Sequence, residues 1–341
     1  MPALPLPLPT CLLPPLLLRL LIASVLAHPG AGLAFGLQTS AVSAAPSPAP
    51  ALHIPGRQDD AHVARIAFRL GEAGRARCPV VEAGTGLVLQ HLSQFHLPGR
   101  AEMIAAWALD RGPGVVAVVP QSPAAMAGVR AGDVLLSVDG TPLPPEPGLA
   151  DPFDAPRAHA RADVVHALLT TGTAPSIAVT LWRDRAVIAA RLQPRPICPS
   201  RVHLARSDQR NAYSDGRRVL LTTGLLAQVT GDDELAFVIA HELAHNILGH
   251  AAIMRGGQVS RGIGRTLGRS GQIVRAAESD ADSLATELML DAGFDPVLGA
   301  QVLRRVGGAT VALFADHAPT DARIAAVAAL VQARRTGVRA R

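Results

Sequence analysis

The sequence predicts an α+β fold, with a mainly helical domain that contains a small sheet and a second, β-rich domain. Two helical patterns indicate the first domain: residues 234–245 read as one apolar helix, and a later pattern ends at Leu290. Apolar runs separated by glycine turns indicate strands within residues 114–192. With 341 residues, 49% of them hydrophobic, the chain can fill the cores of two domains.

The composition excludes one class of partner. All 32 basic residues are arginine, beside heavy use of alanine, glycine and proline, which is typical of a GC-rich genome more than of a binding adaptation. The formal charge of +5 is modest, and aromatic residues make up only 3% of the chain. Because no stretch combines basic and aromatic side chains, we expect no nucleic acid partner.

The N-terminus is predicted to be a targeting segment. Residues 1–34 form a leucine-rich run followed by small residues, which is typical of a secretory signal peptide, with cleavage between residues 27 and 45. Arg19 is the only early charge, so an uncleaved membrane anchor that leaves the rest of the chain in the periplasm is the alternative. Either way we expect a periplasmic or otherwise secreted protein. No later segment has the ~18 apolar residues of a membrane span.

A linker and a helix come next. Residues 35–56 are rich in proline and alanine and are predicted to be a linker. Within residues 57–77, Val63, Ile66 and Leu70 have helical spacing, so we expect a helix that packs on the helical domain.

Two cysteines bracket the β-rich region, which is assigned to residues 78–198. In an oxidising compartment Cys78 and Cys198 can form a disulfide that clamps the base of this region. Two buried thiols are the alternative. A bridge that closes so long a loop contributes up to ~4–5 kcal/mol in the chain-entropy description.

The β-rich region contains a strand run at 114–119, then Ser122-Pro-Ala-Ala followed by Ala-Gly128, then Gly132-Asp133 followed by Asp139-Gly140. In this order the motifs resemble those of the PDZ domains of bacterial envelope proteases. The same resemblance implies a groove helix at 162–169 and closing strands at 177–182 and 186–192. Long insertions are expected at 90–112 and 141–159.

Such a domain binds extended peptides by strand addition, beside a pocket for a terminal carboxylate. The pocket loop is expected near residues 84–89, which makes Gly86 and Leu87 candidate substrate-binding residues. C-terminal protein tails are the implied ligands. A β-rich spacer that binds nothing is the alternative.

Residues 241–245 read His-Glu-Leu-Ala-His, which is the pattern of a zinc peptidase. On a helix His241 and His245 lie about 40° apart, so both imidazoles can reach one metal ion. Glu242 is then placed to act as general base on a water. Leu248 and Ala251 exclude the metzincin pattern. His250 lies about 180° from His241 if the helix continues, and so we expect it to have a structural role.

The third ligand is expected downstream. Glu278 and Asp282 are four residues apart and share one face of a helix. One can bind the metal while the other accepts the N–H of a ligand histidine. A solvated acidic face is the alternative, but the apolar residues Leu284 and Leu288 weaken it.

These motifs together resemble the HtpX and CAAX-prenyl-protease family of zinc metallopeptidases, over residues 200–333. The resemblance also includes Asn211-Ala-Tyr213, Thr223-Gly-Leu-Leu226, Asp291-Ala-Gly-Phe-Asp-Pro296 and His317-Ala-Pro-Thr-Asp-Ala-Arg323, in which Ala318 replaces the usual proline. It implies a gluzincin domain at 199–334, followed by a basic tail at 335–341. By this analogy one Zn²⁺ is bound by His241, His245 and Glu278, Glu242 is the base, and Asp282 supports a ligand from behind.

The expected activity is metalloendopeptidase cleavage of misfolded or tail-presented envelope proteins. His317 and Arg323 are candidate catalytic donors to the oxyanion, although either could instead order the site. Asn211 and Tyr213 are candidate substrate-binding residues, with Tyr213 a weaker donor candidate. The strand 217–221 is expected to pair with substrate backbone.

Residues 251–277 hold five arginines and no acid. We expect a mobile loop there, which is a solvated connector, a lid or a contact with anionic lipid.

Two other functions compete. The chain could be a PDZ-type peptide-binding or chaperone-like protein with a latched or inactive metal site, but the complete ligand set argues against this. A prenyl-CAAX protease would need a chamber of membrane-spanning helices, and the sequence after the N-terminal segment predicts no such helices. The sequence does not indicate an oligomeric state.

Overall fold

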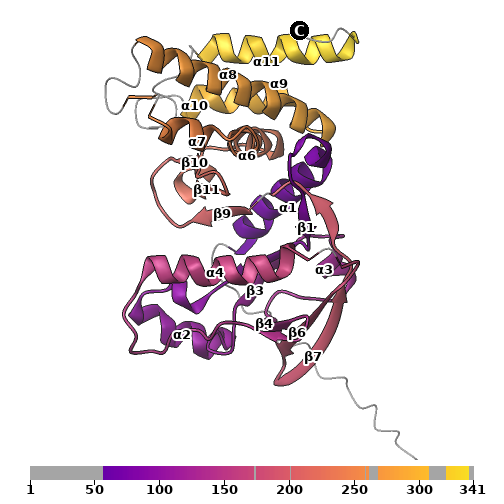
Figure 1. Ribbon diagram of the computed structural model, residues 1–341, viewed down its shortest axis with the longest axis vertical. Coiled ribbons are helices and arrows are strands. Elements are labelled where there is room, and N and C mark those ends of the chain that lie inside the picture. Colours follow the sequence, from indigo (N-terminus) through magenta and orange to yellow (C-terminus); the bar gives the residue numbers. More distant parts are fainter. Residues whose placement is uncertain are drawn as a thin grey trace, which may run out of the picture. The chain divides into compact units, whose positions relative to one another are not determined.

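The computed structural model describes residues 57–172, 174–199, 201–257, 259–260, 268–306 and 320–337. The predicted signal peptide, the linker and His317 lie outside the described residues. All described residues belong to one of the two compact units of the chain, Ala51–Arg341. Figure 1 shows helices and a small sheet in one part of this unit and a larger sheet in the other, which confirms the predicted α+β class.

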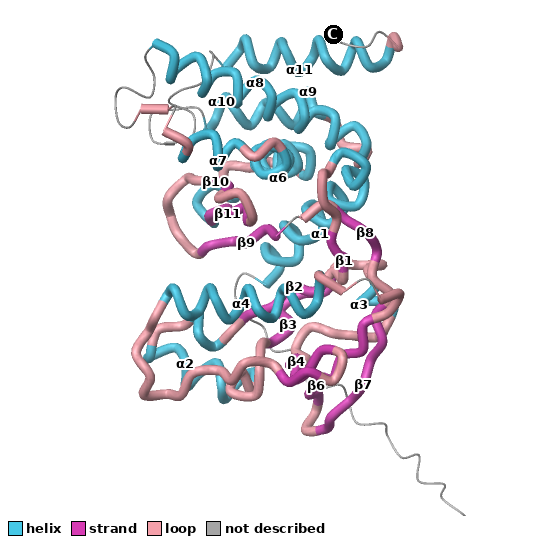
Figure 2. The backbone as a smooth tube through the Cα atoms, viewed as in Figure 1, coloured by secondary structure: helices cyan, strands magenta, loops and turns pink. Residues whose placement is uncertain are grey.

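The larger sheet is antiparallel and has the strand order β2-β3-β4-β6-β7, with β5 paired to β4 (Figure 2). Its strands are β2 (Leu87–Gln90), β3 (Gly114–Val118), β4 (Val134–Val138), β5 (Thr141–Pro142), β6 (Ile177–Arg183) and β7 (Ala186–Leu192). Strand β2 is at one edge of this sheet. Helix α4 (Ala155–Thr170) packs Val165 and Leu169 into the core with Leu135 and Leu181. The short helix α3 (Pro123–Met126) begins at Ser122, whose hydroxyl accepts the N–H of Ala125.

The insertion at 90–112 folds on its own small core. It contains η2 (Leu92–Gln94) and α2 (Leu97–Trp107), and Trp107 packs with Leu92 and Leu109. Arg100 is fully buried and donates to the carbonyl oxygens of Phe95, Gly148 and Asp151. Because Gly148 and Asp151 belong to the second insertion, Arg100 links the two insertions, as do the contacts of Glu146 with His91 and the N–H of Ser93.

A ribbon and a disulfide close the base of the β-rich region. Strand β1 (Glu82–Gly84) pairs with β8 (Arg195–Ile197), and Cys78 is bonded to Cys198 with a Cα–Cα distance of 5.7 Å. The base joins helix α1 (Arg57–Ala73), because the N–H of Cys198 donates to the carbonyl of Gly71, just before η1 (Gly74–Arg77). Residues 79–197 therefore form an inserted module whose two ends meet at one point.

The smaller sheet has the order β10-β11-β9, with bounds β9 (Arg201–Ala205), β10 (Ala212–Ser214) and β11 (Arg218–Thr222). Strand β11 is parallel to β9 and antiparallel to β10. The predicted pairing of strand 217–221 with substrate is therefore wrong, because both edges of β11 are already occupied. Among the described strands of this sheet, β10 has an unpaired edge beside the helix that carries the His-Glu-Leu-Ala-His motif.

The helices of this domain are α5 (Thr223–Leu226), α6 (Asp232–Ile247), α7 (His250–Arg255), α8 (Gly268–Asp291), α9 (Pro296–Gly299), η4 (Ala300–Val302), α10 (Leu303–Val306) and α11 (Thr320–Arg335). They pack on one another and, through α5 and α6, on the smaller sheet. Their core also takes Val63, Ile66 and Leu70 from α1. No helix among the described residues has both the length and the apolar character that a bilayer crossing requires.

One local expectation fails in this region. A mobile loop was expected at 251–277, but its described residues include most of α7 and the first ten residues of α8. The start of α6 is held in another way: its N-cap Gly231 has no side chain, and the carboxylate of Glu234 accepts the N–H of Thr230.

A candidate metal centre and a peptide groove

Helix α6 carries His241, Glu242 and His245 on its most buried stretch. Every residue from Glu234 to His245 is buried, and the three site residues are 3%, 1% and 8% exposed. Helix α8 packs along α6 and brings Glu278 to the same point, where it is 7% exposed. Four ionisable side chains are thus held out of water, which is costly unless they are paired or bind an ion.

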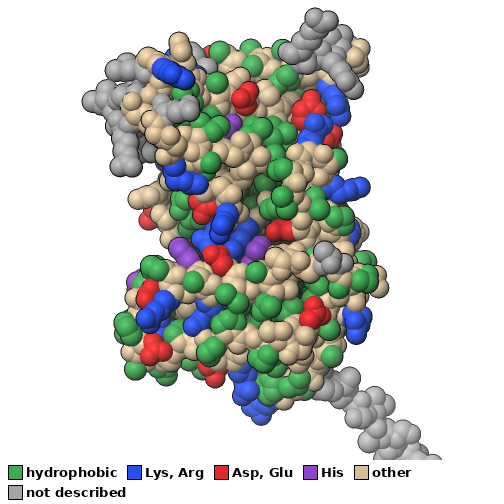
Figure 3. Space-filling view, viewed as in Figure 1, with side chains coloured by type: hydrophobic (Ala, Val, Ile, Leu, Met, Phe, Trp, Pro, Cys, Tyr) green, Lys and Arg blue, Asp and Glu red, His purple; other side chains and the backbone are tan. Residues whose placement is uncertain are grey.

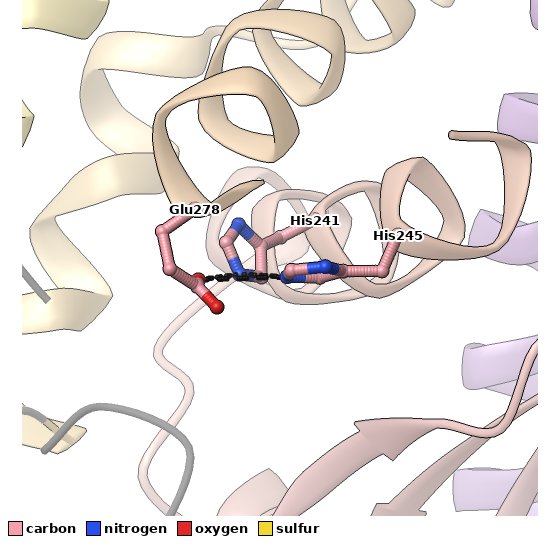
Figure 4. Close-up of side chains that lie close together, drawn as sticks. All are labelled: His241, His245 and Glu278. Atoms are coloured by element: carbon pink, nitrogen blue, oxygen red, sulfur yellow. Dashed lines mark hydrogen bonds and ion pairs between the residues drawn. The ribbon is translucent and has the colours of Figure 1, made fainter. Parts of the chain in front are cut away.

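The geometry of three of these side chains fits a metal ion. His241 Nε2 lies 3.2 Å from His245 Nε2, and Glu278 Oε2 lies 3.2 and 3.4 Å from these two nitrogens. Figure 4 shows the three side chains converging from the two helices. Ligands at 2.0–2.1 Å in a tetrahedral zinc site lie about 3.3 Å from one another. The triangle of donor atoms therefore has the size that one tetrahedral ion requires.

Asp282 orients His241 from behind. Its Oδ1 lies 3.0 Å from His241 Nδ1, which directs Nε2 toward the other ligands. Burial alone would raise the pKa of Asp282, but hydrogen bonds from Arg323 and His241 outweigh it and lower the pKa to about 2. Burial likewise opposes charge on His241, yet the hydrogen bonds to Asp282 and Glu278 raise its pKa to about 10. The raised pKa of His241 indicates a site that strongly favours positive charge.

Arg323 binds Asp282 with both arms of its guanidinium. Nε donates to Oδ2 at 2.7 Å and Nη2 donates to Oδ1 at 2.6 Å, and both side chains are buried. Of the two roles considered for Arg323, this contact favours ordering of the site over donation to an oxyanion. We therefore treat Arg323 as a positioning residue.

His250 reaches the site, contrary to the expectation from helical geometry. Helix α6 ends at Ile247, Gly249 adopts a left-handed φ of 67°, and α7 starts at His250. The redirected chain places His250 Nδ1 2.8 Å from His245 Nδ1. His250 thus supports His245 as Asp282 supports His241.

Glu242 has one partner that sequence reasoning missed. Ser214 Oγ, at the end of β10, donates to Glu242 Oε2 at 3.0 Å. The contact fixes the carboxylate of Glu242 next to the free edge of β10. The only signal for it in the sequence is that Ser214 directly follows the Asn-Ala-Tyr segment matched to the family.

Two other predicted residues, one in β10 and one just before it, do not contact Glu242 in the way that Ser214 does. Tyr213 is 42% exposed and, because side chains alternate along a strand, faces away from the side on which Ser214 meets Glu242. It is therefore not positioned as an oxyanion donor. The backbone N–H and C=O of Asn211 are both bonded to Thr222, so Asn211 anchors the start of β10.

Gly86 and Leu87 lie at the start of edge strand β2. Gly86 has a φ of +79°, and a Cβ there would lie 2.2 Å from the Cβ of Ser122, so only glycine fits. Together with α4, β2 forms a groove of about 160 Å³, which we call the β2–α4 groove. Its lining includes Thr85, Gly86, Leu87, His166 and Leu169.

Substitution of His250 by alanine is expected to weaken metal binding about 10- to 100-fold, because His245 loses the group that fixes its ring. Replacement of the exposed Leu248 by alanine, two residues away, is the control and should leave affinity unchanged. Titration with a competing zinc indicator measures both variants. Equal affinities for H250A and wild type would contradict the positioning role.

Comparisons with known proteins agree with this geometry. The description "Peptidase family M48" matches residues 182–261, which include His241, Glu242 and His245 and end before Glu278. The description "PDZ domain" matches residues 114–148, which hold β3 to β5 but neither wall of the β2–α4 groove. A comparison with curated proteins returned no match.

Among solved structures, the chain is similar to the HtrA3 PDZ domain bound to a phage-derived ligand. The identity is 19%, the match covers 34% of this chain and 89% of that one, and the TM-score is 0.24. The metal-site geometry and the two family matches therefore lead to one conclusion: the chain combines a peptidase M48 domain with a PDZ domain.

Proposed function

We propose that the protein is a zinc-dependent endopeptidase of the cell envelope that cleaves misfolded or tail-presented proteins. The observation that carries the proposal is the buried triangle of His241 Nε2, His245 Nε2 and Glu278 Oε2, next to a carboxylate held by Ser214. The M48 match supports a metallopeptidase.

Each site residue has a distinct task in this proposal. The zinc ion, when bound, supplies a Lewis acid that polarises the scissile carbonyl. Glu242 is the general base that takes a proton from the attacking water, and Ser214 holds its carboxylate in place. His241 and His245 present Nε2 because their Nδ1 atoms are held by Asp282 and His250.

The free edge of β10 is proposed to hold the substrate backbone. An extended segment that pairs with Ala212–Ser214 would lie beside Glu242, because Ser214 is the last residue of the strand. Pairing of this kind uses main-chain groups and so suits unfolded chains of many sequences.

The envelope location is proposed from two features. The predicted signal peptide directs the chain out of the cytoplasm, and the Cys78–Cys198 bridge requires an oxidising compartment to persist. The substrates would therefore be envelope proteins that have lost their fold or that offer a free tail.

Glu278→Ala tests the metal centre. Loss of one of three protein ligands should abolish stoichiometric zinc binding and, with it, cleavage of unfolded casein. Asp280→Ala is the matched control, because Asp280 lies on the same helix but is exposed. Metal analysis of the purified variants, with a chelator-treated wild type beside them, measures the outcome. Full zinc occupancy in E278A would remove Glu278 from the ligand set.

The same assays separate the competing function. A PDZ-type binding protein with an inactive metal site would bind peptides and leave casein intact, with or without added zinc. Zinc-restored cleavage after chelation would exclude that alternative.

A further inference from the structure

The outward face of the smaller sheet carries positive charge. On β9 and β11, Val202, Val219 and Leu221 turn toward the helical core, so alternate residues project from the opposite face. They include Arg201, His203 and Arg218, which we call the cationic face. Arg201 and Arg218 are directly opposite each other in the parallel register.

The cationic face lines a cavity of about 840 Å³, which we call the sheet cavity. The opposite wall belongs to the PDZ domain and includes Leu89, Gln90, Phe95, Trp107 and His159. The cavity is continuous with the β2–α4 groove, since Val88, Leu89, Ala162, Arg201 and His203 line both. The groove of the PDZ domain therefore opens onto the peptidase sheet.

Local acidic groups balance the cationic face only in part. Arg201 and Arg218 both bind Oδ1 of Asp163 on α4, so two guanidinium groups share one carboxylate oxygen. Burial alone would raise the pKa of Asp163, but the hydrogen bonds from Arg218 and Arg201 outweigh burial and lower the pKa. Figure 3 shows arginine and histidine side chains gathered between α4 and β9.

Other charged side chains that line the cavity have contacts of their own, and Arg57 stacks on the ring of Trp107 at 4.3 Å from its centroid. Asp60 is paired with Arg206, and Asp215 accepts the backbone N–H groups of Arg217 and Arg218. His203 is held neutral, since burial and then the charges of Arg201 and Arg218 lower its pKa to about 4. A ligand that brings a carboxylate would find arginines that are positioned but incompletely neutralised.

We propose that the sheet cavity binds acidic side chains of a polypeptide tail whose C-terminal residue occupies the β2–α4 groove. The selectivity for acid comes from the peptidase domain, through Arg201 and Arg218, and not from the PDZ domain. This inference deepens the proposed function by naming its substrate class, and it rests on that function for the cleavage step alone.

The direction of β2 determines which residues of the tail enter the cavity. A tail added antiparallel to β2 places its C-terminus near Leu87 and its preceding residues near Gln90. The four residues of β2 span about 13 Å at ~3.3 Å per residue. The acidic side chain is therefore expected about four to six positions before the C-terminus.

Strand β10 borders the cavity on one face and the metal centre on the other. Tyr213 lines the cavity, and the next residue, Ser214, points to the opposite face and binds Glu242. A tail that leaves the cavity along β10 would reach the edge proposed to hold the scissile segment. A tail bound in this way would run from the groove through the cavity to the edge of β10.

Labelled peptides test the proposal on the full-length Glu242→Gln protein, which binds without cleavage. Two peptides share four apolar C-terminal residues and differ upstream in Glu-Glu against Gln-Gln. Fluorescence anisotropy at fixed salt should show about tenfold tighter binding of the acidic peptide, the effect expected of a charge-assisted hydrogen bond. Arg201→Gln with Arg218→Gln should remove this preference, whereas Arg217→Gln, an exposed neighbour outside the cavity, should keep it.

Three results would overturn the proposal: equal affinity for the two peptides, loss of preference in R217Q, or a preference that survives in R201Q/R218Q. Thermal unfolding of each variant identifies any that have lost their fold, and single Arg218→Gln then replaces the double variant. Cleavage of casein by wild type is measured separately. Intact cleavage with no acidic preference would reject this inference and leave the proposed function standing.

Discussion

Glu242→Gln is expected to lower the rate of proteolysis by about 10²- to 10⁴-fold while leaving metal content unchanged. Glutamine has nearly the shape of glutamate and can still accept the hydrogen bond from Ser214, so the buried site keeps its packing. It cannot take a proton from the attacking water. The loss should therefore appear in kcat and not in zinc affinity.

A quenched peptide substrate and metal analysis measure the two quantities on the same preparation. Glu287→Gln, at a partly exposed glutamate of α8 paired with Arg77, is the control and should retain both activity and zinc. Ser214→Ala should give an intermediate rate, because the base remains but loses its anchor. Normal turnover by E242Q would refute the assignment of the base.

Replacement of both Cys78 and Cys198 by alanine is expected to lower the free energy of unfolding by about 4–5 kcal/mol. The two residues are separated by 120 positions, so the bridge restricts a very large loop in the unfolded chain. Alanine is preferred to serine because Cys198 is 0% exposed and a buried hydroxyl would add a cost of its own.

Denaturant unfolding of the oxidised wild type, the reduced wild type and the double variant measures this contribution. The reduced protein and the variant should have the same midpoint, below that of the oxidised protein. Identical midpoints for all three would mean that the bridge does not contribute to stability.

The core of the metal centre was predictable because it depends on one local rule. A helix brings residues four apart to one face, and this rule places His241 beside His245 and Glu278 beside Asp282. The burial of all four follows from the apolar residues around them. The rule places each pair on its own helix, and the choice of Glu278 as the ligand that joins the two histidines came from the family resemblance.

The position of His250 could not be predicted from helical spacing. Its placement 180° from His241 holds only for a continuous helix, and Gly249 interrupts α6 with a left-handed backbone. Gly249 was a visible signal that the helix ends before His250, because glycine is the usual residue at a helix C-terminus. The contact to His245 across the break was not visible, since it depends on the direction that α7 takes.

Strand order and the contacts between domains could not be predicted. Strand β11 has the sequence Arg-Val-Leu-Leu-Thr, and its apolar run fits an edge strand as well as a central strand. The pairing of Asp163 with Arg201 and Arg218 joins residues 38 and 55 positions apart. Such contacts arise from the packing of two domains, for which no periodicity exists in the chain.

The 5.7 Å between the Cα atoms of Cys78 and Cys198 has a consequence for how this architecture can be changed. The chain enters and leaves residues 79–197 through adjacent positions, so two or three glycines could span the gap in their place. Residues 79–197 could therefore be exchanged as a unit. Another recognition domain with neighbouring termini could be spliced into the same position, and the helical domain would keep its own chain path.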